Sequence, residues 1–208
     1  MWICRCATTS LVLQGHASFI CVPCNLHGLR RQLGWDVTAW LVSAPVLSRL
    51  DYCNAILVGL PQITLSLLQR VLHAAARIVI NLQLCDHVTP ALLELHWLLI
   101  TERIDFKLCL LVHKALVGRA PTYTVDLIRP VANLPSRASL RTAVSGDLYV
   151  PRTCRRFEDR AFAVAAPRVW NGLPTDIKLH RLTTTSFKRR LKTVLFNRGF
   201  AECMWMTL

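Results

Sequence analysis

The sequence predicts a mostly α protein: a small helical bundle followed by a basic α+β segment with a short β-hairpin. Apolar residues recur every three or four positions through most of residues 27–118, which is the helical period. After about residue 133 short alternating runs replace that period, and basic residues become frequent. With 208 residues, 53% of them hydrophobic, the chain has enough apolar surface to bury a core in one domain or two small ones.

The first helices are expected on either side of a proline. Asp36 is a suitable N-cap for a helix that Pro45 should break or kink, because proline lacks a backbone donor and clashes one turn back. A second helix is expected over Val46–Leu57, where Gly59 and Pro61 would end it.

The clearest helix covers about residues 62–81. Its apolar residues repeat at helical spacing and are Leu65, Leu68, Leu72, Ala75 and Val79. A shorter helix near 89–97 and a longer one over about 101–118 follow. The apolar stripe of the longer helix is Ile104, Leu108, Leu111 and Leu116. Because no run of 18 apolar residues is free of charge, no transmembrane helix is expected.

The last part of the chain is expected to contain a hairpin and two helices. Ser145 and Gly146 form the predicted turn, and apolar or β-branched residues alternate on both sides of it: Leu140, Thr142, Val144, Leu148 and Val150. One helix is expected over 156–166, ending before Pro167, and another over 185–197. The second would place Phe187, Leu191, Val194 and Leu195 on one face.

Charge gives the main indication of a partner. The chain has 25 basic and 12 acidic residues, a net charge of +13, and 19 of the basic residues lie after residue 100. Arginine predominates, and its planar fork matches phosphate oxygens. This composition favours nucleic acid or an anionic membrane surface as a partner, although a solvated basic surface would look the same.

Basic residues concentrate between Arg137 and Arg198, where 14 of them accompany only four acidic residues. They cannot all pair internally, so we expect a subset to bind RNA or DNA: Arg152, Arg155, Arg156, Arg160, Arg168, Lys188, Arg189, Arg190 and Lys192. Five aromatic residues are interleaved, namely Phe157, Phe162, Trp170, Phe187 and Phe196. Aromatics among arginines are typical of single-strand binding, but we expect these five to form the core of the segment.

Catalytic and metal-binding patterns are few. Glu158 and Asp159 are the only adjacent carboxylates, and flanking arginines favour ion pairs over metal binding. Nine scattered cysteines favour a reducing compartment. A zinc or redox site at Cys21 and Cys24 and a signal peptide at the N-terminus are weaker alternatives. We therefore expect no catalytic residue, no metal and no cofactor.

Several short strings appear in a characteristic order over about residues 25–196. They are Ser48–Asn54, Leu68–Val71, Ala74–Arg77, Asp86–Pro90, Leu95–Leu98, Arg103–Lys107, Lys114–Leu116, Ala120–Tyr123, Val150–Thr153, Asp159–Phe162, Ala165–Pro174 and Ser186–Lys192. This series resembles the C-terminal end of the polyprotein of LINE-type non-LTR retrotransposons, of the jockey and chicken-repeat kind. The chain departs from that pattern at Pro45, where the family has an aromatic residue, and at Leu99, where proline is usual.

The resemblance implies a region that follows the palm of a reverse transcriptase. Residues 25–133 would be thumb-like helices and residues 134–198 a basic C-terminal segment, with 1–24 a divergent leader and 199–208 a tail. The palm motif, an aromatic residue followed by x-Asp-Asp, is absent from the sequence, so no enzyme activity is expected.

The expected function is that of a non-catalytic fragment that contacts nucleic acid. Its partner would be RNA or DNA of a template–primer, bound with little sequence preference, and it would have no membrane partner and no small-molecule substrate. The expected location is nuclear or cytoplasmic. The alternatives are an inert or protein-interaction remnant of a decayed transposon copy, and a membrane or secreted protein.

Overall fold

The computed structural model describes residues 23–83, 85–135, 144–155, 157–179 and 183–204. The expectation of a mostly α protein is confirmed, since the regular elements within these ranges are helices and none is a β-strand. The chain divides into two compact units. Unit 1 comprises the described residues up to Tyr52 together with Gln62–Ile100, and unit 2 comprises Cys53–Pro61 with the described residues from Thr101 onward. The expected segment boundary after residue 133 falls inside unit 2.

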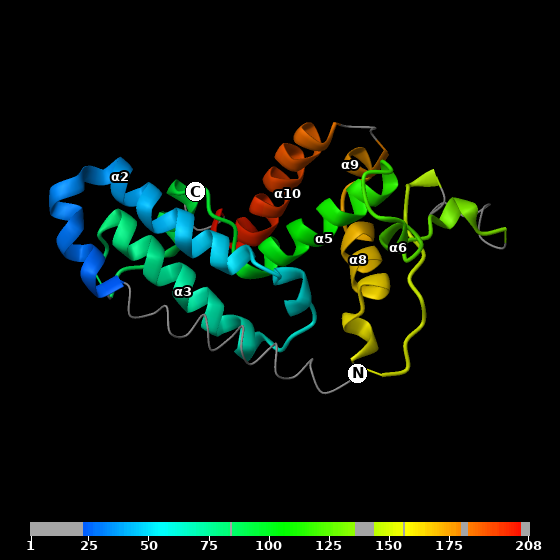
Figure 1. The fold of residues 1–208 in the computed structure, drawn as a ribbon, viewed down its shortest axis with the longest axis horizontal. Coiled ribbons are helices and arrows are strands. Elements are labelled where there is room, and N and C mark those ends of the chain that lie inside the picture. Colours follow the sequence, from blue (N-terminus) through cyan, green and yellow to red (C-terminus); the bar gives the residue numbers. More distant parts are fainter. Residues whose placement is uncertain (1–22, 84, 136–143, 156, 180–182, 205–208) are drawn as a thin grey trace. The chain divides into compact units, whose positions relative to one another are not determined.

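Unit 1 is built on two long helices that lie side by side, α2 (Pro23–Asp51) and α3 (Gln62–Ile80) (Figure 1). The five stripe residues expected on α3 are all buried, and α2 contributes buried Val42, Val46 and Leu50. A short helix, α4 (Thr89–Glu94), also packs on α3 and ends earlier than expected. By length and composition α3 would also be able to cross a bilayer, a test that core helices pass as well.

The expected break at Pro45 is wrong. Helix α2 runs without interruption through this residue, and Asp36 lies in its interior instead of capping a start. Pro45 is exposed, whereas Val42 and Val46 on either side are buried. Burial of this face therefore outweighs the lost backbone hydrogen bond. The expected second helix over Val46–Leu57 is also corrected, because α2 ends at Asp51.

Unit 2 contains α5 (Ile100–Leu116, with Ile100 counted in unit 1), α6 (Thr122–Val125), α8 (Phe162–Asn171), α9 (Thr175–Leu179) and α10 (Thr184–Met204). Short 3₁₀ turns occur at η2 (Asn54–Leu57), η3 (Val131–Asn133) and η4 (Glu158–Arg160). Three aromatic side chains meet at its centre. The Phe187 ring lies 4.0 Å from that of His113 and 5.8 Å from that of Trp170, centroid to centroid, and so joins α10, α5 and α8.

The expected β-hairpin is not supported. Val144 is helical and Leu140 and Thr142 lie outside the described residues, while Leu148 forms an antiparallel bridge with Pro130. The Val131 N–H donates to the Asp147 carbonyl at 3.0 Å, and the Tyr149 N–H donates to the Arg129 carbonyl at 2.8 Å. Around Leu148 the chain is thus extended, and its partner there comes from earlier in the chain.

Two other expected helices have different bounds. In place of a helix over 156–166 that stops before Pro167, α8 starts at Phe162 and contains Pro167, which is buried. The buried side of α8, which includes Trp170, favours continuing the helix past that proline. The expected last helix, 185–197, is confirmed and extends to Met204 as α10.

Candidate nucleic-acid interface

Helix α10 carries a basic surface opposite a buried face. Lys188, Arg189, Arg190 and Lys192 are exposed, and we call these four residues the basic face. Phe187, Leu191 and Leu195 on the other side are fully buried, as the sequence predicted, whereas Val194, expected on the same face, is only partly covered. Among the described residues, no carboxylate forms an ion pair with any member of the basic face. Four cations within five consecutive positions therefore face solvent with no anionic partner from the described chain.

The start of α10 is fixed by local hydrogen bonds. Thr183 acts as the N-cap, because its hydroxyl accepts the Ser186 N–H at 3.3 Å. Its backbone carbonyl accepts the Phe187 N–H at 2.9 Å, which completes the first turn. The basic face begins at the next residue, so this cap sets where its four cations emerge.

The far end of α10 is held on α5 by a buried acidic cluster. Arg198 pairs with Asp105, and Gly199 approaches Glu102 so closely that an added Cβ would lie 3.1 Å from the Glu102 carboxyl carbon. Burial raises the pKa of Glu102 and, despite the pairing with Arg198, that of Asp105 as well. The same burial raises the pKa of the neighbouring Cys109 thiol far above its usual range. Arg198 thus has an internal role and does not extend the basic face.

The loop before α8 contains two acidic residues, Glu158 and Asp159, and both form hydrogen bonds within this part of the chain. Asp159 accepts hydrogen bonds from the Thr153 hydroxyl at 2.6 Å and from Arg168 at 2.8 Å, and these lower its pKa, with Thr153 the larger cause. Glu158 accepts the backbone N–H groups of Cys154 at 3.1 Å and Arg155 at 3.4 Å. Both acids of the loop are therefore used in holding it together.

Arg160 is also a structural residue. Its guanidinium donates from Nε to the Val58 carbonyl at 3.2 Å and from a terminal nitrogen to the Ile56 carbonyl at 3.3 Å. Gly59 permits this approach, since an added Cβ would lie 2.9 Å from the Arg160 Cγ, and its φ of 67° also favours glycine. Arg160 thereby ties the loop to residues 56–58 of the same unit.

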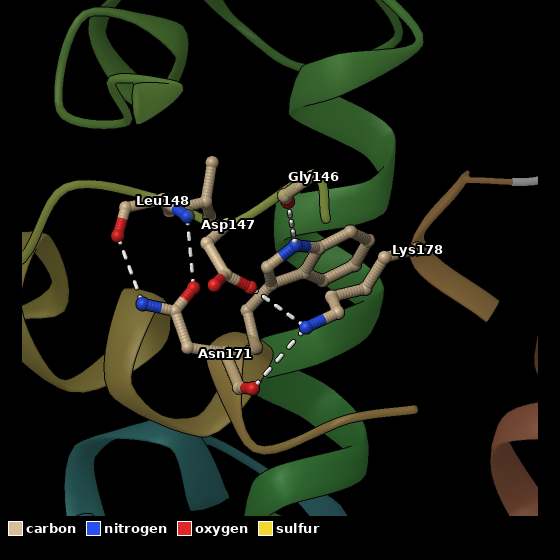
Figure 2. A network of polar contacts seen from close by, with 6 residues as sticks. Gly146, Asp147, Leu148, Asn171 and Lys178 are labelled. Carbon is tan, nitrogen blue, oxygen red and sulfur yellow. Dashed lines mark hydrogen bonds and ion pairs between the residues drawn. The ribbon is translucent and has the colours of Figure 1, made fainter. Parts of the chain in front are cut away.

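A polar network joins α8 and α9 to the extended segment (Figure 2). The Asn171 side chain donates to the Leu148 carbonyl and accepts the Leu148 N–H, both at 2.8 Å, as a neighbouring strand would. Lys178 pairs with Asp147 at 2.7 Å and also donates to the Asn171 carbonyl at 3.2 Å. The Trp170 indole N–H donates to the Gly146 carbonyl at 3.1 Å. The network fixes Trp170, against which Phe187 of α10 packs.

The nine basic residues selected from the sequence have different surroundings. Lys188, Arg189, Arg190 and Lys192 form the basic face, and Arg152 and Arg155 are exposed in the loop. Arg168 is half-exposed in its pair with Asp159, Arg160 binds backbone carbonyls, and Arg156 lies outside the described residues.

Of the five interleaved aromatics, Trp170 and Phe187 are buried as expected and Phe162 and Phe196 are partly covered. Phe157 departs from the core prediction, because 48% of it is exposed. The Arg155 guanidinium carbon lies 5.9 Å from the Phe157 ring centroid, a cation–π distance. A local signal for this exposure exists in the sequence, because charged residues flank Phe157 on both sides whereas alanines flank Phe162.

Comparisons and metal-binding groups add no further assignment. No family model, curated protein or solved structure matches the chain. Within the described ranges, no group of three or more His, Cys, Asp and Glu side chains is arranged to hold a metal ion. On α10 the arrangement offers four exposed cations, a chemistry that suits binding to phosphate.

Proposed function

We propose that this chain contacts the sugar–phosphate backbone of RNA or DNA through the basic face of α10, and performs no catalytic step. The observation that carries the proposal is the exposure of Lys188, Arg189, Arg190 and Lys192 above a fully buried face on the same helix. Each contacted phosphate releases condensed counterions, so such binding is strong at low salt and has little sequence preference.

We further propose that the chain is a fragment of a LINE-type reverse transcriptase from the region after the palm. Support comes from the ordered series of strings in the sequence. One of them, Ala165–Pro174, supplies Trp170 and Asn171 to the polar network, so this string has a role in the fold. The nucleic acid would then be a template–primer duplex.

The test is a salt titration of binding to a labelled RNA–DNA hybrid. If about five phosphates are neutralised, the wild-type log–log slope should lie near −4 to −5. Changing Lys188, Arg189, Arg190 and Lys192 together to Gln should flatten the slope by roughly 3 to 4 and leave the helical circular dichroism unchanged.

A charge-matched control separates the basic face from net charge. The double variant Lys188→Gln/Lys192→Gln should flatten the slope by about 2. The double variant Arg70→Gln/Lys107→Gln removes the same charge from exposed positions on α3 and α5 and should leave the slope nearly unchanged. Equal slopes for the two doubles would place the contact elsewhere. No binding by the wild type at low salt would favour the inert or protein-interaction alternative.

A further inference from the structure

Helix α5 ends in a glycine cap that fixes the position of Arg119. Gly118 has a φ of 71°, and its N–H donates to the Ala115 carbonyl at 3.2 Å. The Arg119 N–H donates to the Lys114 carbonyl at 2.8 Å. This pair of bonds is the Schellman arrangement, in which glycine takes the left-handed conformation directly after a helix. The backbone of Arg119 is therefore held at the end of α5, and its exposed side chain starts from a defined place.

The Arg119 side chain reaches the first turn of α10. One of its terminal nitrogens donates to the Thr184 hydroxyl at 3.4 Å, a contact between residues 65 positions apart. Thr184 is the first residue of α10 and follows the N-cap Thr183. The fold thus brings an arginine from the middle of the chain to the helix that carries the basic face. Charge counting between Arg137 and Arg198 could not include this residue.

Arg119 differs from the arginines of this unit that hold the fold together. Arg160 uses two of its nitrogens on backbone carbonyls, and Arg198 pairs with the carboxylate of Asp105. In the described part of the chain, Arg119 forms no ion pair, and its side chain has a single hydrogen bond, to the Thr184 hydroxyl. Because a hydroxyl carries no charge, the guanidinium charge is uncompensated and most of its donors can still bind a phosphate.

Arg119 extends a row of cations on α10. Thr184, Lys188 and Lys192 follow one another at intervals of four residues, so they lie on the same side of the helix. Each interval advances about 6 Å along the axis, and the whole row covers about 12 Å. One strand of a duplex has a phosphate about every 3.4 Å of axis, so a strand along this row passes roughly three or four phosphates. Arg119, held at Thr184, adds a positive charge at the N-terminal end of the row.

We propose that Arg119 binds a phosphate of the same nucleic acid as the basic face, so that one strand runs along Arg119, Lys188 and Lys192. The inference rests on the proposed nucleic-acid function and adds to its site a residue from the end of another helix. An arginine that only tied α5 to α10 would need its hydrogen bond to Thr184 and not its charge. The two roles are therefore separable by substitution.

The test is the same salt titration of the full chain on the labelled RNA–DNA hybrid. Arg119→Gln should weaken binding at low salt and flatten the log–log slope by about 1, the change expected for one lost phosphate contact. Arg119→Lys keeps the charge and should keep the slope. Thr184→Val removes the acceptor of the hydrogen bond but no charge, and should also keep the slope. Arg129→Gln is the matched control, since Arg129 is an exposed arginine of the same unit outside α5 and α10, and it should leave the slope unchanged.

Melting temperatures separate a lost contact from a change of fold. Arg119→Gln should melt at the wild-type temperature, and adding it to the quadruple Gln variant of the basic face should remove most of the slope that remains. A wild-type slope in Arg119→Gln would overturn this inference and leave the basic face supported. Equal flattening by Arg129→Gln would show an effect of net charge, and equal flattening by Thr184→Val a structural tie; either result would also overturn it. If the wild type did not bind the hybrid, both proposals would fail.

Discussion

Replacing Lys178 by methionine tests the polar network directly. Lys178 is buried with a side chain only 4% exposed, and its partner Asp147 is 16% exposed. Methionine preserves the length and most of the apolar stem, but it leaves the Asp147 carboxylate with no cation and the Asn171 carbonyl without that donor. Breaking a buried pair by removing one partner costs about 3–5 kcal/mol. Because Asp147 keeps some contact with water, we expect the lower end, about 3 kcal/mol.

For a chain of this size, that loss should lower the melting temperature by roughly 6–12 °C. The assay is thermal and urea unfolding followed by circular dichroism, applied to Lys178→Met, Asp147→Asn and the double variant. The double variant should lose less than the sum of the singles by about 1–3 kcal/mol, since the stranded charge is then gone.

The matched control for this pair is Arg168→Met. Arg168 pairs with Asp159 at 2.8 Å, but the two side chains are 48% and 37% exposed. An ion pair as exposed as this one contributes little to stability, so this variant should be nearly as stable as the wild type. Equal destabilisation by Lys178→Met and Arg168→Met, or strict additivity in the double variant, would refute the account of a buried pair.

Three further outcomes are expected. Pro45→Phe should raise the urea unfolding free energy by on the order of 1–3 kcal/mol, because α2 is continuous there and lacks one backbone donor; an unchanged or lower value would contradict this. Glu102→Gln should raise the melting temperature at pH 7 but not near pH 4. Burial raises the pKa of Glu102, so the folded state is favoured while this carboxyl is protonated at low pH. That stability is lost as pH rises through the raised pKa, and glutamine, which stays neutral, does not lose it. The purified chain with magnesium should not extend a primer on an RNA template above a mock preparation.

The parts of the fold that follow a helical period could be predicted from the sequence. Helical spacing alone predicted the burial of Leu65, Leu72 and Val79 on α3 and that of Phe187 and Leu191 on α10. On α5 the stripe was correct at its start but not at its end, where 44% of Leu116 is exposed. The period fixes which residues share a face, but only the neighbouring helices decide how far along the helix that face is covered.

The errors arise where tertiary contacts outweigh local preference. Prolines 45 and 167 both lie inside helices, because buried neighbours stabilise the helix more than a lost donor destabilises it. The predicted β-hairpin is wrong for another reason. The alternating run is extended at Leu148, but its hydrogen-bonding partners are the backbone groups of Arg129 and Val131 and the Asn171 side chain, and an alternating pattern does not encode its partner.

The sequence predicted that the candidate interface would be rich in basic residues, but it did not predict which of these residues would be exposed. A surplus of arginine over acid pointed to nine residues, of which four form an exposed set on α10. Arg160 and Lys178 have the same chemistry in the sequence, yet each is used to hold the fold together. Charge counting cannot separate these roles, because an arginine that caps carbonyls needs no acidic neighbour.

Residues Cys53–Pro61 belong to unit 2, although the segments on both sides of them belong to unit 1. Their contacts span long stretches of chain: the Asn54 side chain donates to the Arg103 carbonyl, and the hydrogen bond from Arg160 to Val58 joins residues 102 positions apart. Closing such loops costs entropy before any contact forms, and high contact order slows folding. Residues 53–61 therefore cannot form these contacts during synthesis until residue 160 has been made. A fragment that starts at residue 101 would lack Leu57 and both carbonyl acceptors of Arg160, so dissecting this protein requires keeping residues 53–61 with the C-terminal half.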